Sequence, residues 1–336
     1  MPLTRRTALT AALAAPAIGR FGPGGAAEAE FVFKYANNVP ETYPLNVRTR
    51  QAADRIRQAT NERFDLQIFP AGQLGTDTDM LSQVRSGAIQ FYTASGLVLS
   101  TLVPVAAINA VGFAFKTYAQ VWPAIDGRLG ALVRARIEAA GLHAMDRIFD
   151  IGFRQITAST HPIAMPDDLK GFKIRIPPSQ LGVSMFDGLG ASPVTLNFAE
   201  AYTALQTHVV DGQENPLSII DTAKFYEVQK FVSLTNHMWD GYWMLCHGRS
   251  WRGLPDDIRA VLTRELGRAA DEDRADIAAL DASLQTKLEA KGMAFNTPDQ
   301  APFRAVLQKA GFYAQWRKTF GEEAWTALEG YVGALA

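Results

Sequence analysis

FVFKYA at residues 31–36 opens the stretch that decides the fold, because it begins an alternation of strand and helix patterns. Residues 44–60 are helical in pattern, FDLQIFP at 64–70 is strand-like, residues 77–86 are helical again, and AIQFYTA at 88–94 returns to a strand pattern. Strand, helix and strand at this spacing predict a parallel sheet with right-handed crossovers. This part of the chain is therefore predicted to be an α/β unit.

A second unit begins near Gly152. FRQITA at 153–158 and FKIRIPP at 172–178 are strand patterns, and residues 181–189 follow as a helix. The alternation in FKIRIPP puts Arg175 on the face opposite the apolar residues, before two prolines stop the pairing. Ligands of open α/β sheets bind at strand ends, and a guanidinium matches a carboxylate with two parallel hydrogen bonds. Arg175 is therefore predicted to point away from the core, toward a ligand.

Two later helices have recognisable first residues. Asn197 is a predicted helix cap, with Glu200 three positions inside the helix. The apolar stripe predicted for this helix consists of Ala201, Leu205 and Val209. Asn215 is predicted to cap the next helix, with Pro216 at its first position.

Residues 254–292 predict one long helix. The segment has almost no strand formers and one internal glycine, Gly267, so the helix is expected to be much longer than average. A coiled-coil dimer is the alternative for such a helix. The apolar stripe is rich in alanine and holds no sustained leucine heptad, which disfavours that alternative.

The first 27 residues have the pattern of an export signal. Arg5 and Arg6 precede the apolar run ALTAALAAPAI and the small-residue segment GPGGAA. The run is shorter than the roughly 20 apolar residues that span a membrane. We therefore expect a periplasmic protein whose mature chain begins near Glu28 and is not inserted in the membrane. The paired arginines leave the twin-arginine route and the Sec route open.

Composition and motifs favour a binding protein. Without the three arginines of the signal, 30 basic residues stand against 34 acidic ones, which argues against a nucleic-acid partner. The single cysteine, Cys246, excludes an intramolecular disulfide. The sequence contains no nucleophile elbow, phosphate-binding glycine loop, dinucleotide fingerprint or zinc-protease motif, and its five histidines lack metal-ligand spacing. We therefore expect no catalytic residue, cofactor or metal.

Four segments, in order, carry a family resemblance: FRQITAS at 153–159, FKIRIPP at 172–178, NFAEAYTALQ at 197–206 and DGQENPL at 211–217. They resemble the solute receptors of tripartite ATP-independent periplasmic (TRAP) transporters, the DctP family, and the resemblance runs from about Phe31 to the C-terminus. It implies a type II periplasmic-binding-protein fold, with two α/β lobes, a cleft, a hinge and a long bridging C-terminal helix. The implied lobes are 28–151 with about 241–280, and 152–240 with about 281–336. A monomeric receptor that serves an integral membrane permease is expected.

The resemblance also implies site residues. Arg175 and Arg154 would bind the carboxylate of the ligand, and Asn215 would supply an amide contact unless it only caps a helix. Phe198 matches an aromatic that lines the cleft of the family, although it could be a core residue. The other implied contacts are Asn37, Ser95, Tyr92 and Trp239; Tyr242 and Trp243 lie near pocket positions, and these aromatics could equally be core.

The ligand class follows from what this set contains. Ser95 stands where sialic-acid receptors of the family carry an acidic residue, which disfavours a polyhydroxylated sugar acid. Apolar walls favour a 2-oxo or 2-hydroxy monocarboxylate with an apolar or aromatic body. The alternatives are a sugar-acid or dicarboxylate receptor of the same family, a receptor that feeds a sensor kinase, and an exported cleft enzyme that acts on a small acid.

Overall fold

A computed structural model describes residues 29–335 of the protein. The predicted export signal at 1–27 and the chain start near Glu28 lie outside these residues. The predicted alternation at the start of the fold is confirmed, with the elements β1 (Phe31–Ala36), α1 (Pro44–Ala59), β2 (Phe64–Phe69), α2 (Asp77–Ser86) and β3 (Phe91–Ser95). β1 pairs in parallel with both β2 and β3. These elements lie within the range predicted for the first lobe, and we call them the first lobe.

The second lobe has its own parallel strands. Its elements are β6 (Lys173–Ile176), α6 (Gln180–Gly188), β7 (Ser192–Thr195), α7 (Phe198–Gln206), β8 (Gly212–Pro216) and α8 (Leu217–Thr222). β6 pairs in parallel with both β7 and β8. α7 begins where the sequence predicts, since Asn197 is its N-cap and the Glu200 carboxylate accepts a hydrogen bond from the Asn197 backbone N–H at 3.0 Å.

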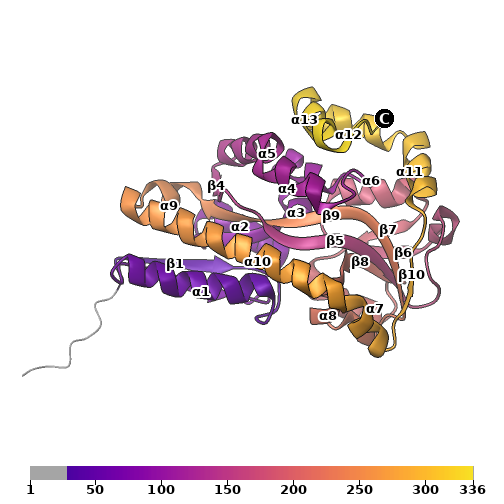
Figure 1. Cartoon of the computed structure of the whole chain (residues 1–336), viewed down its shortest axis with the longest axis horizontal. Helices are drawn as coiled ribbons and strands as arrows, with labels where there is room; N and C mark the ends of the chain where they lie inside the picture. Colours follow the sequence, from indigo (N-terminus) through magenta and orange to yellow (C-terminus); the bar gives the residue numbers. More distant parts are fainter. Residues whose placement is uncertain (1–28, 336) are drawn as a thin grey trace, which may run out of the picture.

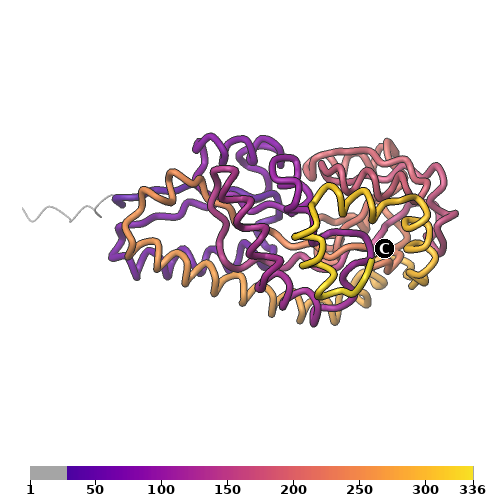
Figure 2. The backbone as a smooth tube through the Cα atoms, turned by 90° about the horizontal axis from the view of Figure 1, so that it is seen from above, coloured from indigo at the N-terminus to yellow at the C-terminus, as the bar shows by residue number. Residues whose placement is uncertain are grey.

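Two long antiparallel strands, β5 (Phe149–Ala158) and β9 (Phe231–His247), connect the lobes. The sheet follows the order β2-β1-β3-β9-β5-β8-β6-β7, and β4 (Leu142–Ala144) and β10 (Ala294–Asn296) also pair with β9. β9 pairs with β3 through its last residues and with β5 along the rest. Figure 2 shows the two parts of the molecule side by side, with chain segments crossing between them.

The predicted long helix is α10 (Asp256–Ala290), which has 35 residues and is therefore about 50 Å long. It packs on α1 of the first lobe, on β5, and on α8 of the second lobe, and Figure 1 shows it running across both parts. The bridging role expected from the family resemblance is thus seen in its contacts.

The remaining helices cover the sheet and close the chain. They are α3 (Gly96–Leu99), η1 (Pro104–Ala110), α4 (Tyr118–Asp126), α5 (Arg128–Ala139), η2 (Pro166–Leu169), η3 (Phe225–Glu227), α9 (Gly248–Arg252), α11 (Gln300–Lys309), α12 (Phe312–Phe320) and α13 (Glu322–Val332). α11 and α12 contact α6, whereas α13 packs on α4 and α5. The C-terminal segment therefore contacts elements on both sides of the predicted lobe boundary.

Two local predictions are wrong. Asn215 does not cap a helix, because it lies in β8 and pairs with Gln155 of β5. The backbone of Pro216 is still extended (φ −62°, ψ 156°), so α8 begins at Leu217. Val209 does not extend the stripe of α7. That helix ends at Gln206, His208 turns the chain with a φ of 56°, and Val209 is 54% exposed.

Candidate functional site

A cavity lies where the second-lobe strand ends meet the first lobe. Its free volume is about 10 Å³, which is room for about one water molecule, and we call it the inner cavity. Strands β5, β6 and β8 bring Arg154, Arg175 and Asn215 to it, the start of α7 brings Phe198, and the end of β3 brings Ser95. Its other lining residues are Asn38, Asp77, Val98, Pro177 and Tyr242. Five of the eight predicted site residues therefore come together.

Arg175 is a buried cation without an acidic partner. It is 1% exposed, and its Nε and Nη2 donate to the Leu196 carbonyl at 3.0 and 2.7 Å. No carboxylate among residues 29–335 lies within 4.0 Å of its guanidinium nitrogens. Burial lowers the pKa of Arg175 to about 10, although the more distant charges of Asp77 and Glu214 act in the opposite direction. A buried charge normally needs a partner of opposite sign, so this side of the cavity is suited to an anion.

Arg154 is buried to a similar extent, at 2% exposed, but its charge is offset within the protein. Its Nη2 donates to Glu214 Oε1 at 2.8 Å and to the Glu214 carbonyl at 2.7 Å, its Nε also pairs with Glu214, and its Nη1 donates to Asp240 Oδ2 at 2.9 Å. Burial alone would lower the pKa of Arg154, but the two carboxylates raise it above its usual range. Arg154 therefore has partners without a ligand.

The partners of Arg154 are themselves held by neighbours. His237 Nε2 lies 3.1 Å from Glu214 Oε2, and burial lowers the pKa of this histidine. Burial opposes ionisation of Glu214, yet Arg154 and His237 lower the pKa of Glu214 to about 2. Ser95 Oγ donates to Asp240 Oδ2 at 2.7 Å, and burial raises the pKa of Asp240. The result is a hydrogen-bonded network behind the inner cavity.

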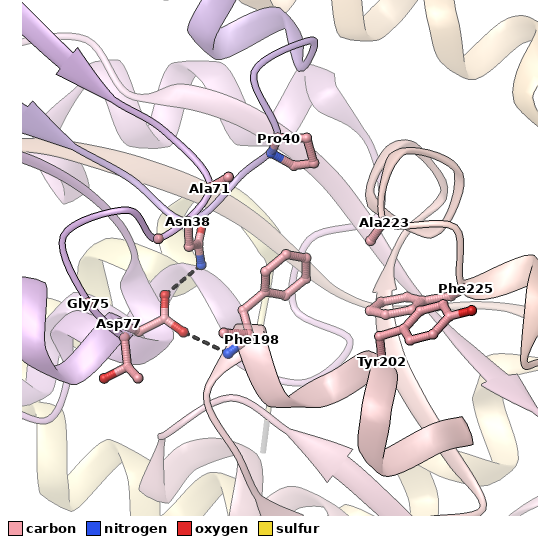
Figure 3. Close-up of a pocket in the computed structure, with 12 residues that line it drawn as sticks. Asn38, Pro40, Ala71, Gly75, Asp77, Phe198, Tyr202, Ala223 and Phe225 are labelled. Atoms are coloured by element: carbon pink, nitrogen blue, oxygen red, sulfur yellow. Dashed lines mark hydrogen bonds between the residues drawn. The ribbon is translucent and has the colours of Figure 1, made fainter. Parts of the chain in front are cut away.

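Asp77 links the two lobes by hydrogen bonds at the edge of the inner cavity. It is 2% exposed and lies in the first turn of α2. Its Oδ1 accepts from Asn38 Nδ2 at 2.6 Å, and its Oδ2 accepts from the backbone N–H of Phe198 at 2.8 Å (Figure 3). The second bond crosses the cleft to the first residue of α7.

A second space, the outer cavity, also borders Asp77 and has a free volume of about 230 Å³. Figure 3 shows Phe198, Tyr202 and Phe225 facing it from the second lobe. The rest of its lining consists of small residues and a few polar ones: Asn38, Pro40, Ala71, Gly72, Gly75, Thr76, Asp77, Ala199 and Ala223. The wall is mainly apolar, and Asn38, Asp77 and Phe198 line both cavities.

Three predicted site residues do not line the inner cavity. Asn37 is fully buried and donates to Asn46 Oδ1 at 2.7 Å, and its neighbour Asn38 lines the cavity instead. Tyr92 lies in β3 on the face opposite Ser95, as strand alternation requires, and donates to the Asp77 carbonyl. Trp239 donates to Asp150 Oδ1 at 3.0 Å and packs edge-on against the ring of Trp122.

Sequence reasoning missed three parts of the site. The helical pattern at 77–86 gives Asp77 no role, although a carboxylate in the first turn of a helix is well placed to accept hydrogen bonds. Glu214 adjoins Asn215 in the DGQENPL motif, and that adjacency was an available signal. No sequence pattern indicates Asp240, because it lies 86 residues from Arg154 and local patterns do not contain that contact.

Comparisons with known proteins show the family. The model for bacterial extracellular solute-binding protein, family 7 (DctP), matches residues 35–318. The 2,3-diketo-L-gulonate-binding periplasmic protein YiaO of Escherichia coli K12 is 30% identical over 266 residues, covering 79% of this chain and 80% of that protein. The C4-dicarboxylate-binding periplasmic protein DctP of Rhodobacter capsulatus is 32% identical over 270 residues, covering 80% and 78%.

Solved structures agree with this result. A TRAP periplasmic solute binding protein from Polaromonas sp. JS666, bound to D-erythronate, matches with a TM-score of 0.85 and 29% identity, covering 90% of this chain and 99% of that one. The two lobes and the cleft between them define the class of periplasmic binding proteins. This chain belongs to bacterial extracellular solute-binding protein family 7, the DctP family, as its motifs predict.

Two other features are absent from residues 29–335. No helix in this range combines the length and the apolar character needed to cross a membrane. No cluster of three or more histidine, cysteine, aspartate or glutamate side chains in this range is arranged to hold a metal ion.

Proposed function

We propose that the protein is a periplasmic receptor that captures an organic acid by closing its cleft, with the ligand carboxylate bound to Arg175. The observation that carries this proposal is the burial of Arg175 without an acidic partner. Its planar group can meet a carboxylate with paired hydrogen bonds. Asn215 and Phe198 line the same cavity, and the amide of Asn215 is suited to a second ligand oxygen.

Closure needs no covalent change. A ligand that binds the closed state better than the open one shifts the equilibrium toward closure. Arg175 is 1% exposed in the structure, so an anion bound to it would interact with it away from water, where the low dielectric strengthens the attraction. We therefore expect the protein to release its ligand unchanged and to have no enzymatic turnover.

The preferred ligand is a 2-oxo or 2-hydroxy monocarboxylate with an apolar or aromatic body. Val98, Pro177, Phe198 and Tyr242 give the inner cavity apolar surface, and the outer cavity adds Tyr202 and Phe225. The relatives named above bind acids according to their names, and these acids include C4-dicarboxylates and sugar acids. The apolar walls of this chain favour a different body on the same carboxylate.

The partner that follows from family membership is a TRAP permease in the inner membrane. The closed receptor would deliver its acid to that permease after export of the mature chain to the periplasm. The supporting observations are the family membership and the helix α10, which packs on elements of both lobes.

A thermal-shift screen tests the proposal. Aromatic and branched 2-oxo and 2-hydroxy acids are compared with dicarboxylates, hexuronates, and neutral and cationic solutes. At about one hundred times its Kd a ligand adds roughly 2.7 kcal/mol of stability, which is readily detected in a melting curve. We expect the first group to give the largest shifts. Shifts only with dicarboxylates or hexuronates would contradict the apolar body, and shifts only with neutral or cationic solutes would contradict the carboxylate.

The absence of turnover is tested separately. The acid that gives the largest shift is incubated with the protein, the protein is denatured, and the released compound is measured by mass spectrometry. Quantitative recovery of unchanged acid is the expected result. Conversion to a product that grows with time and protein concentration would instead identify an enzyme.

A further inference from the structure

The charged side chains that line the inner cavity differ in whether they have salt-bridge partners. Its charged lining residues are Arg154, Arg175 and Asp77. Arg154 is engaged by Glu214 and Asp240, so Arg175 is the cation of this lining that has no acidic partner among the described residues. One carboxylate of a ligand can therefore be matched by a charge that is not already paired, and a second one cannot.

The remaining charged group of the lining is acidic. No lysine, arginine or histidine nitrogen among residues 29–335 lies within 4.0 Å of the Asp77 carboxylate. Its two oxygens accept from Asn38 and from the first backbone N–H of α7, and helix N-termini stabilise a negative charge. Asp77 borders both cavities, so a ligand that reaches from Arg175 into the outer cavity passes it.

A second ligand carboxylate would meet two obstacles there. It would lie close to a buried carboxylate of the same sign, where the low dielectric strengthens repulsion. It would also compete with Asp77 for the Phe198 N–H, which is a bond that holds the two lobes together. An apolar group meets neither obstacle, and a hydroxyl group could donate to Asp77.

We propose that Asp77 is a specificity-determining residue that makes this receptor select acids with one carboxylate over acids with two. The inference rests on the proposed function, because it takes Arg175 as the anchor of the first carboxylate. It adds a specific role for the first lobe, which is to reject a second negative charge near the start of α7.

The test uses two acids with the same five-carbon 2-oxo chain: 4-methyl-2-oxopentanoate, a monocarboxylate, and 2-oxoglutarate, a dicarboxylate. Calorimetric affinities are measured for the wild type, Asp77→Asn and Asp77→Ser, after a melting curve has verified that each variant is folded. Asp79→Asn is the matched control, because Asp79 lies in the same turn of α2 but is exposed and bonded to Thr76.

We expect the wild type and Asp79→Asn to bind the monocarboxylate at least tenfold more tightly than the dicarboxylate. In Asp77→Asn or Asp77→Ser the ratio of the two affinities should fall at least fivefold, whereas a purely structural role would weaken both acids together. Equal affinity of the wild type for both acids, or an unchanged ratio in folded Asp77 variants, would overturn the selectivity but leave the carboxylate receptor intact. Failure of the wild type to bind either acid would overturn both this inference and the proposed ligand class.

Discussion

The two arginines of the cleft are buried alike and paired differently. Arg154 is held by Glu214 and Asp240, whereas Arg175 donates only to the Leu196 carbonyl among the described residues. Their pKa values move in opposite directions for this reason, upward for Arg154 and down to about 10 for Arg175. The difference shows that burial alone does not mark a ligand contact. A cation is available to a ligand when the protein has left its charge unmatched.

The largest expected effect belongs to Arg154→Ala. Removing this guanidinium leaves Glu214 and Asp240 buried without a cation, and breaking a buried charge pair in this way costs about 3–5 kcal/mol of unfolding free energy. Urea denaturation measures the loss. Arg175→Ala is the matched control and should lose much less stability, because no carboxylate among residues 29–335 forms a salt bridge with Arg175. A loss below about 1 kcal/mol for Arg154→Ala would contradict the contrast between the two arginines.

Asp150 and Asp273 are buried carboxylates without a salt-bridge partner among the described residues, and they extend the comparison between paired and unpaired buried charges. They are 1% and 0% exposed. The Asp150 backbone N–H donates to Asp273 Oδ2 at 2.9 Å, which ties β5 to α10. Burial raises the pKa of Asp150 to about 7, and burial together with Asp150 raises the pKa of Asp273 well above its usual range.

The pH dependence follows from the sign of these shifts. Unfolded aspartates have a pKa near 3.9, so the folded state binds more protons than the unfolded state above about pH 4. This pair therefore contributes stability that is fully present below about pH 4 and decreases as pH rises toward 7 and beyond. Glu214 behaves oppositely, because its lowered pKa contributes stability above about pH 4 that is lost as pH falls toward 2.

Asp273→Asn tests this dependence of the free energy of unfolding on pH. We expect the variant to gain stability relative to the wild type as pH rises from 4 to 8, because the amide keeps an acceptor and carries no charge. Urea denaturation across this pH range gives the difference. Asp276→Asn is the control, since Asp276 is partly exposed and paired with Arg48, and it should not reproduce the change. An unchanged slope in Asp273→Asn would show that Asp273 does not hold a proton in the folded state.

The smallest expected effect concerns Ser95, which supports the network from the first lobe. Ser95→Ala removes the hydroxyl that donates to Asp240 and accepts from the Leu97 N–H, and should cost about 1–2 kcal/mol of unfolding free energy. Ser86→Ala, at an exposed hydroxyl of α2, should change stability by less than about 0.5 kcal/mol. If Ser95→Ala cost as much as Arg154→Ala, the network would depend on the serine rather than on the charge pairs.

Local patterns predicted most of the fold. The strand and helix alternation at 31–95, the start of α7 at Asn197 and the long helix α10 depend on periodicity, caps and propensity, which neighbouring residues determine. Asn215 and Pro216 have the residue types of a helix start, and only pairing with β5 keeps Asn215 in a strand. That pairing joins segments 60 residues apart, which a local pattern does not contain.

The candidate site was predictable in part for the same reason. The motifs identified Arg175 and Asn215, both of which line the inner cavity. They could not distinguish the paired Arg154 from the unpaired Arg175, because Glu214 and Asp240 lie 60 and 86 residues from Arg154 in sequence. Strand alternation puts Tyr92 and Ser95 on opposite faces of β3, and only Ser95 lines the inner cavity. The sequence pattern does not include Ser95 in the strand, so this distinction could not be predicted.

Calorimetric titration of Arg175→Ala with the acid that binds the wild type most tightly tests the central claim most directly. The variant should melt near the wild-type temperature yet lose about 2–5 kcal/mol of binding free energy, which is roughly a thirtyfold to several-thousandfold loss of affinity. Arg175→Lys should also bind poorly, because a point charge lacks the planar pair of donors. Wild-type affinity in a folded Arg175→Ala protein would contradict the claim that the unmatched guanidinium anchors the ligand.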